Sequence, residues 1–367
     1  MMKAYFLLSN LLDPAKDKMT GGVISNLLMI EKISGYMSVV LLPIMYEATP
    51  SSLAQKETVS IVPPSYLGTS YMKYAVERYV FYQRRVEKAI KRYGPGILIA
   101  TRATIPIAYR LSVINQMPFI IITRAFENLE QIGLRKPLDK ISIFRRAEGI
   151  LNKRQLISAY RSADLIITNS KFMKEEHVRL FKTNVPFYIS YPLIDLPMSS
   201  PVVNKIKTIG FVSKGKRKGG ELIHSVAARM PDKNFIVYGE PIDKKLGDLP
   251  NLRYAGYTND RVHMYKSVDL FLVPSAWDEP YGRVASEAIW SGLPVLISKR
   301  GGLPEAAPEE LFWVVGDTAE IWEDKIRNLS FNKYKPTLEG AIRSAQIKLS
   351  SQPDDLPGVL YSFFMKK

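Results

Sequence analysis

Short apolar runs recur along this chain and alternate with longer segments whose apolar positions repeat at helical spacing. Continuous apolar strands separated by helices predict parallel sheets that helices cover on both faces. Two series of strands are expected, at residues 3–8, 38–42, 97–101, 119–123 and 165–168, then at 208–212, 234–238, 269–273, 294–297 and 311–315. The clearest helical patterns lie at residues 23–33, 72–92, 156–162, 221–229 and 284–290.

Two series of strands predict two doubly wound domains, and a length of 367 residues favours two cores over one. A cluster of Pro192, Pro197, Ser199, Ser200 and Pro201 is typical of a linker. We therefore predict a first domain at residues 1–195, a linker at 196–206, a second domain at 207–345 and a C-terminal helical segment at 346–367.

Composition excludes several kinds of site. The chain has no cysteine, which excludes disulfides, thiolate metal sites and a cysteine nucleophile. His177, His224 and His263 lack metal-ligand spacing and are expected at the surface or at helix caps. No apolar run reaches the roughly 18–20 residues of a membrane span. The N-terminus is expected to be a first strand and not a signal peptide, which favours a cytoplasmic protein.

Charge is unevenly distributed. The net charge is +16, of which residues 1–198 contribute +12. A basic first domain favours an anionic acceptor, an anionic membrane surface or nucleic acid. Within it, residues 72–92 combine aromatic and basic side chains. They are expected to form a helix with one face on the sheet and one face in water, with docking to a membrane as the alternative.

The most informative chemistry is at residues 274–296, PSAWDEPYGRVASEAIWSGLPVL. A strand ends there in a loop that holds Glu279 and Gly282, and the following helix carries Glu287. Unpaired N–H groups at a helix start favour an anion such as phosphate. Ionised carboxylates accept hydrogen bonds from sugar hydroxyls. Phosphate and polyol in one crevice indicate a nucleotide-sugar, whereas two solvated surface glutamates are the alternative.

Residues 256–304 resemble the C-terminal half of the retaining glycosyltransferases of family 4, which have the GT-B fold. The shared features are a strand ending in Pro-Ser, a Glu-x-x-Gly loop, a second Glu after seven residues and a Gly-Gly-x-x-Glu turn. Residues 210–223, GFVSKGKRKGGELI, resemble the family's phosphate-binding segment, and Gly21-Gly22 resembles its N-terminal glycine loop. The resemblance implies two Rossmann-like domains facing a cleft, with a C-terminal helix that returns to the first domain.

The resemblance also assigns roles at the sugar end of the donor. Glu287 would bind the ribose hydroxyls, and Glu279 would face the sugar as a catalytic-site residue. Tyr281 and Gly282 would bring backbone close to the donor. Arg283 would point at phosphate or cap the sheet edge. Gly21 and Gly22 would approach the phosphates or sugar from the first domain, with an ordinary strand–helix turn as the alternative.

Cations are expected around the diphosphate, because without a metal they must stabilise the charge of the leaving group. Lys218, before Gly219, matches the family's lysine. The family's arginine falls on Ser213, or on Lys214 if the loop is one residue shorter, and a lysine would lose bidentate phosphate geometry. A solvated basic turn is the alternative. The family's donor-contacting histidine is absent after the strand at 119–123, where Arg124 and Glu127 are the available polar groups for acceptor or sugar, or ordinary surface residues.

The sequence therefore predicts a metal-independent retaining glycosyltransferase. It would need no cofactor and would move a sugar from a UDP- or GDP-sugar to a glycan, lipid-linked or small-molecule hydroxyl. The first domain is also expected to make peripheral contact with an anionic membrane. Specific binding to nucleic acid is not expected. The alternative is a non-catalytic basic protein on the same scaffold that docks on anionic membrane or nucleic acid.

Overall fold

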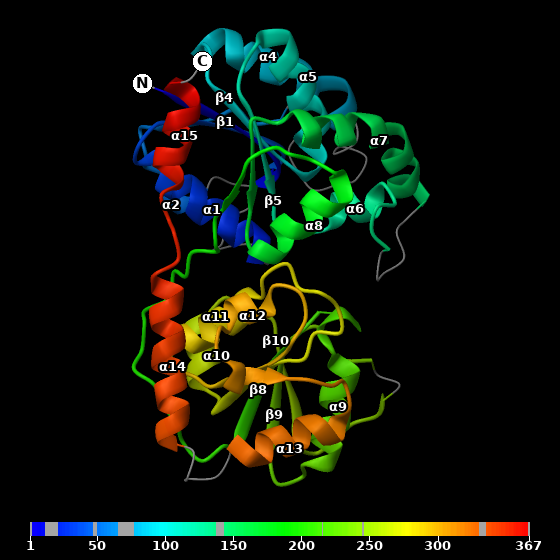
Figure 1. Cartoon of the computed structure of the whole chain (residues 1–367), viewed down its shortest axis with the longest axis vertical. Coiled ribbons are helices and arrows are strands. Elements are labelled where there is room, and N and C mark those ends of the chain that lie inside the picture. Colours follow the sequence, from blue (N-terminus) through cyan, green and yellow to red (C-terminus); the bar gives the residue numbers. More distant parts are fainter. Residues whose placement is uncertain are drawn as a thin grey trace. The chain divides into compact units, whose positions relative to one another are not determined.

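The computed structural model describes residues 2–11, 21–46, 50–64, 77–136, 143–214, 216–243, 246–329 and 335–365. The chain forms two compact units (Figure 1). Unit 1 comprises Met1–Leu193 together with Pro353–Lys367, and unit 2 comprises Ile194–Gln352. Each unit is built around one parallel sheet.

Unit 1 contains a seven-stranded parallel sheet in the order β3-β2-β1-β4-β5-β6-β7. Its central strands are buried on both faces and are rich in isoleucine, leucine and valine, as parallel sheets require. The strands are β1 (Lys3–Leu11), β2 (Ser38–Tyr46), β3 (Val59–Ile61), β4 (Ile97–Thr101), β5 (Phe119–Thr123), β6 (Leu165–Thr168) and β7 (Phe187–Ile189).

Helices cover both faces of this sheet. Right-handed crossovers put helices on opposite faces when successive strands are added in opposite directions from β1. Accordingly, α1 and α15 lie together on one side, and α4, α5 and α7 on the other (Figure 1). The helices are α1 (Gly21–Ser34), α2 (Ser51–Ala54), α4 (Tyr82–Tyr93), α5 (Ile105–Asn115), α6 (Glu127–Gln131), α7 (Ile143–Ser162), α8 (Lys171–Phe181) and α15 (Leu356–Met365), with short turns η1 (Glu77–Phe81) and η2 (Arg102–Thr104).

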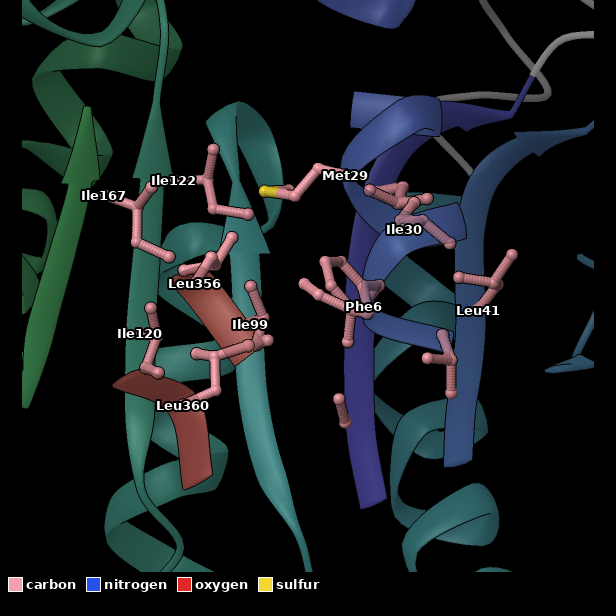
Figure 2. Close-up of a cluster of buried hydrophobic side chains, with 14 of the residues drawn as sticks. Phe6, Met29, Ile30, Leu41, Ile99, Ile120, Ile122, Ile167, Leu356 and Leu360 are labelled. Carbon is pink, nitrogen blue, oxygen red and sulfur yellow. The ribbon is translucent and has the colours of Figure 1, made fainter. Parts of the chain in front are cut away.

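The C-terminal helix completes the core of unit 1. Leu356 and Leu360 of α15 are buried in the same cluster as Phe6, Ile99 and Ile120 of the sheet (Figure 2). A segment more than 150 residues beyond the last strand of this sheet therefore covers part of the sheet's apolar face. This confirms the predicted return of the C-terminal helix to the first domain.

Unit 2 contains a six-stranded parallel sheet in the order β10-β9-β8-β11-β12-β13. Here α9 packs with α13, and α11 packs with α12 and α14. The strands are β8 (Thr208–Ser213), β9 (Asn234–Gly239), β10 (Leu252–Gly256), β11 (Leu270–Val273), β12 (Val295–Ser298) and β13 (Trp313–Val314). The helices are α9 (Gly220–Arg229), α10 (Arg261–Lys266), α11 (Arg283–Trp290), α12 (Leu303–Ala306), α13 (Ala319–Leu329) and α14 (Lys335–Ser350), with short turns η3 (Lys216–Lys218) and η5 (Glu310–Phe312).

Several expected boundaries differ from the observed ones. The C-terminal helical segment was expected to start at residue 346. This residue lies inside α14, which continues to Ser350 and belongs to unit 2. The helix expected at 156–162 begins at Ile143, and the part of the 72–92 helix before residue 77 lies outside the described residues. Three strands, β3, β7 and β10, had no expected counterpart. No described helix is both long and apolar enough to span a bilayer.

Candidate functional site

The candidate site lies where the strand order of unit 2 reverses. Strands β8 and β11 are neighbours, but the connections that follow them run toward opposite edges of the sheet. In open parallel sheets this switch point leaves a crevice at the carboxyl ends of the strands. The chain leaving β8 enters η3 and α9, and the chain leaving β11 enters a loop that ends at α11.

Two close backbone contacts bring these connections together. Ala276 N donates to Arg217 O at 2.9 Å. Gly219, the cap of α9, has a φ of +77°, and a Cβ added there would lie 2.0 Å from Pro274 O. Only glycine fits such a contact, because it combines a left-handed conformation with no room for a side chain. The predicted donor-binding Gly219 is therefore required for packing at the site.

Glu279 is buried and occupies the centre of the site. Its Oε1 accepts from Lys218 Nζ at 2.6 Å, from Ser275 Oγ at 2.6 Å and from Trp277 Nε1 at 2.9 Å. Burial acts to raise the pKa of Glu279, but Lys218 and the two hydrogen bonds outweigh it and hold the pKa below its ordinary value. No donor to the other oxygen, Oε2, is found among the side chains that the structure describes.

The backbone around Glu279 is fixed as well. Gly302 N donates to Glu279 O at 2.7 Å. Gly301 has a φ of +58°, and a Cβ there would lie 2.4 Å from the same carbonyl. The Gly-Gly turn singled out in the sequence therefore packs directly on the loop of Glu279. Held by backbone and by three side-chain donors, this carboxylate is preorganised for a ligand.

Glu287 lies on the second turn of α11 and is also buried. Its Oε1 accepts from Arg261 Nη1 at 2.9 Å and from Arg283 Nε, and its Oε2 accepts from Tyr265 OH at 3.1 Å. Burial and the neighbouring Glu287 raise the pKa of Tyr265 well above its ordinary value, so this hydroxyl stays a donor. Arg283 binds two carboxylates, those of Glu287 and Asp195.

Gly282 and Tyr281 shape the start of α11. Gly282 caps the helix with a φ of +102°, and a Cβ there would meet Leu303 Cδ2 at 2.3 Å. The Tyr281 side chain is buried, and burial raises its pKa to about 12. These two residues therefore pack the loop of Glu279 against the turn that follows β12.

The two alternative positions for a second cation, Ser213 and Lys214, differ from Lys218 in their surroundings. Ser213 is buried at the end of β8, where its carbonyl accepts from Glu240 N at 3.1 Å. Lys214 is exposed, and no ion pair with it is found among the described residues. Arg217, which the sequence reasoning passed over, lies with its guanidinium 5.0 Å from the centroid of the Trp277 ring. Trp277 thus contacts both Glu279 and a cation.

Of the predicted residues of unit 1, Arg124 contacts the helix that begins with Gly21 and Gly22, and Glu127 has a different partner. Gly21 and Gly22 form the first turn of α1, not the loop before it, and a Cβ on Gly22 would meet nothing within 4 Å. Arg124 donates Nε to Asn26 Oδ1 at 3.1 Å, whereas Glu127 pairs with Arg102 at 2.8 Å. No described protein atom therefore fills the space beside Gly22.

Several site residues were missed by the sequence reasoning, namely Asp195, Arg261, Tyr265, Ser275 and Trp277. Ser275 stands in the Pro-Ser motif that was noted, so a signal existed for it. Arg261 comes from α10 and Asp195 from the chain before β8, and only the fold brings Arg261 to Glu287 and Asp195 to Arg261. Within the described ranges, no cluster of three or more His, Cys, Asp or Glu side chains could hold a metal ion.

Part of the chain is similar in sequence to known proteins. Residues 202–345 match the family described as "Glycosyl transferases group 1". An uncharacterized 42.6 kDa protein in the cps region of Klebsiella pneumoniae is 30% identical over 179 residues, which are 45% of this chain and 44% of that protein. A sulfoquinovosyl transferase of Arabidopsis thaliana is 32% identical over 102 residues, 26% of this chain and 20% of that one. The chain spans less than half the length of these curated relatives.

The structural match covers the whole chain. HepE from Anabaena, solved in complex with UDP, aligns with 100% of this chain and 99% of its own, with a TM-score of 0.70 and 17% sequence identity. HepE has also been solved with UDP-glucose. Together with the two doubly wound sheets, this match confirms the predicted GT-B fold of two Rossmann-like domains. Residues 202–345 thus resemble a glycosyltransferase domain, and the chain as a whole has the GT-B fold.

Proposed function

We propose that this chain is a glycosyltransferase that moves a sugar from a nucleotide-diphosphate sugar to a hydroxyl acceptor. The observation that carries the proposal is the contact between Lys218 and the buried Glu279 at the switch point of unit 2. A fixed carboxylate can accept hydrogen bonds from sugar hydroxyls, and an adjacent ammonium can bind a diphosphate. The relatives named above, including one whose structure holds UDP-glucose, support the same assignment.

We also propose a reaction without a metal ion. Departure of the nucleoside diphosphate leaves negative charge that the site must stabilise. Lys218 stands one residue before Gly219, the cap of α9, and a helix start presents unpaired N–H groups that favour an anion. These groups can provide the positive field that a divalent cation provides elsewhere.

Retention at the anomeric carbon is the finer part of the proposal. For enzymes of the resembled family, front-face substitution is the usual mechanism, in which the leaving phosphate takes the acceptor's proton. Neither Glu279 nor Glu287 is then an acid or base of the kind found in glycoside hydrolases. Both would bind substrate: Glu279 the transferred sugar, and Glu287 the ribose.

The test is release of nucleoside diphosphate from a panel of UDP-, GDP- and ADP-sugars, measured in EDTA and again with Mg²⁺. One donor should be turned over equally in both conditions. Lys218→Ala and Glu279→Gln should lower the rate by about 100-fold or more, because each removes a group that acts on the developing charge or holds the sugar. Lys205→Ala, an exposed lysine of unit 2, is the control.

Full turnover by Lys218→Ala or Glu279→Gln would overturn the assignment. Turnover that required added metal would overturn the metal-free mechanism alone. The anomeric configuration of the product, read by NMR, tests retention separately, and an inverted product would refute it.

We further propose that unit 1 contacts anionic membrane through α4, α5 and α7. These helices adjoin one another, and Arg110 of α5 donates to Gln83 of α4 at 3.3 Å. Exposed aliphatic side chains, suited to partial insertion at a lipid interface, stand among the cations. Every exposed charged side chain described on the three helices is basic, namely Arg84, Lys88, Lys91, Arg92, Arg110, Lys153, Arg154 and Arg161.

Sedimentation with vesicles tests this contact. Binding to phosphatidylcholine vesicles should require added phosphatidylglycerol and should weaken as salt rises. Reversing Lys88, Lys91 and Arg92 to Glu should weaken binding by about 100-fold or more, at about 1 kcal/mol per basic residue. The control reverses Lys205, Lys207 and Arg253, which are exposed in unit 2 and change the net charge equally. Equal losses in both variants would refute a specific surface.

The same surface favours the alternative function, a basic docking protein without turnover. That function predicts polyanion binding with steep salt dependence and no response to nucleotide-sugars. The release assay separates the two, because only the glycosyltransferase consumes a donor.

A further inference from the structure

Asp195 joins the two arginines that hold Glu287. It is the second residue of unit 2 and precedes β8. Arg261 donates Nη1 to Asp195 Oδ1 at 2.9 Å and Nη2 to Oδ2 at 2.5 Å, and Arg283 donates Nη2 to Oδ1 at 2.8 Å. Two carboxylates and two guanidinium groups thus form a quartet without net charge, which consists of Asp195, Arg261, Arg283 and Glu287.

The quartet uses the two oxygens of Glu287 unequally. Both arginines donate to Oε1, whereas Oε2 accepts only the Tyr265 hydroxyl among the contacts that the structure describes. Each carboxylate oxygen accommodates about two donors. Oε1 of Glu287 already has two donors, whereas Oε2 has one and has capacity for another hydroxyl.

Asp195 accounts for this division. A guanidinium beside a carboxylate tends to bind both oxygens through two parallel N–H bonds. Arg261 makes that two-pronged contact with Asp195 and reaches Glu287 through Nη1 only. Burial opposes the charge of Asp195, but Arg261 and Arg283 outweigh it and hold its pKa below the ordinary value. The carboxylate is therefore ionised at neutral pH.

We propose that Asp195 is a positioning residue for ribose recognition, because its grip on Arg261 and Arg283 leaves Oε2 of Glu287 open to a ribose hydroxyl. This inference rests on the proposed function, in which Glu287 binds the ribose. Asp195 acts through the arginines and not on the ligand. Without its charge the group would carry one net positive charge, and a guanidinium could take both oxygens of Glu287.

Titration calorimetry with paired nucleotides tests the inference. UDP, GDP and ADP are each compared with their 2′-deoxy counterparts, for the wild-type chain and for Asp195→Asn. Loss of a hydrogen bond to a charged group corresponds to about 10- to 100-fold in affinity, so the wild type should prefer the ribose form by that factor. In Asp195→Asn the preference should fall below about threefold, while affinity for the deoxy form stays within about threefold of wild type.

The matched control is Glu323→Gln. Glu323 on α13 also bridges two arginines of unit 2, with Arg229 at 2.8 Å and Arg327 at 2.9 Å. It should keep the full ribose preference, and Asp195→Glu, which keeps the charge, should restore part of it. A merely structural role for Asp195 would weaken the ribose and deoxy forms alike.

Two results would overturn the inference in distinguishable ways. A wild-type chain that binds nucleotide without preferring ribose would refute the role of Glu287, and this inference with it. A wild-type preference that persists unchanged in Asp195→Asn would refute the positioning role of Asp195 alone and leave the proposed function standing.

Discussion

Glu279 and Glu287 are similar in the sequence but have different surroundings in the fold. Glu279 is paired with one lysine and two neutral donors, whereas Glu287 is shared by two arginines and a tyrosine. The motif predicted both residues as parts of one site. It could not predict their partners, because Arg261 reaches Glu287, and Asp195 reaches Arg261 and Arg283, from segments without any local signal. Residue type and spacing therefore located the carboxylates, and only tertiary packing gave them their cations.

The cation prediction shows the same limit. Lys218 was predicted beside the donor and lies at Glu279, but Ser213 is buried and Lys214 is exposed away from any described ion pair. Spacing alone cannot determine which side chain of a short basic turn faces inward. In this turn Lys218 faces Glu279, and the next residue, Gly219, caps α9 in a left-handed conformation.

Gly219 gives a residue-scale prediction. Gly219→Ala should destabilise unit 2 by about 2 kcal/mol or more and lower donor turnover, because the Cβ would meet Pro274 O in addition to the cost of a positive φ. Gly247→Ala is a matched control: its φ is +78°, but nothing lies within 4 Å of a Cβ there. It should cost about 1 kcal/mol from the conformation alone. Urea unfolding followed by tryptophan fluorescence measures both, and equal losses would contradict the packing role.

His177 was expected at the surface or at a cap, and this was wrong. It is fully buried on α8, where Nδ1 donates to Met173 O at 2.7 Å and Nε2 lies 3.0 Å from Thr123 Oγ1. Burial lowers its pKa to about 4, from an ordinary value near 6.5. Sequence gave no signal for this, because one histidine on a mixed helix face is compatible with either environment.

A pH dependence of stability follows for unit 1. Between pH 6.5 and 4 the unfolded state binds a proton at His177 that the folded state does not, so stability falls as pH decreases through that window and is unaffected above it. The loss should be about 2–3 kcal/mol. Urea unfolding followed by far-UV circular dichroism should show this loss of stability in the wild type but not in His177→Gln. The control variant His263→Gln, which changes an exposed histidine, should show the same loss as the wild type. An unchanged pH dependence in His177→Gln would contradict the assignment.

At the scale of elements, the strands that were missed share a position. β3 and β7 are the two edges of the sheet in unit 1, and β10 is an edge of the sheet in unit 2. Helices do not cover edge strands on both faces as they cover central strands. Edge strands therefore lack the continuous apolar run that predicts a buried strand. In β10, Arg253 and Tyr254 are both exposed. The central strands, buried on both faces, were predicted closely for the same physical reason.

The helix α15 gives an element-scale prediction. Leu360 is fully buried in unit 1, whereas its neighbour Tyr361 is 55% exposed. Leu360→Ala should destabilise unit 1 by about 2–4 kcal/mol, and Tyr361→Ala by less than about 0.5 kcal/mol. All four tryptophans, at positions 277, 290, 313 and 322, belong to unit 2. The far-UV circular dichroism transition should therefore shift while the tryptophan fluorescence transition does not.

The opposite pattern would contradict the assignment of α15 to unit 1. If Leu360→Ala shifted the tryptophan transition as much as the circular dichroism transition, the helix would contribute equally to both units. If neither transition shifted, burial of Leu360 would not contribute to the stability of unit 1.

At the scale of the molecule, alternation of strands and helices was sufficient to predict two doubly wound units. The same pattern predicted a site at the carboxyl ends of the strands of unit 2, where Glu279 and Lys218 meet. It could not identify the sugar, the base or the acceptor, because these depend on a few side chains whose positions have no periodic signal. Arg124 and Glu127 illustrate this, since each has its own partner in unit 1.

The most direct test of the central claim is calorimetric titration of the chain with UDP-, GDP- and ADP-sugars in the presence of EDTA. We expect one member of the panel to bind with one-to-one stoichiometry, and both Lys218→Ala and Glu279→Gln to weaken that binding by about 10-fold or more. Binding of no nucleotide-sugar, or equal binding by wild type and both variants, would contradict the claim that the switch point of unit 2 holds an activated sugar.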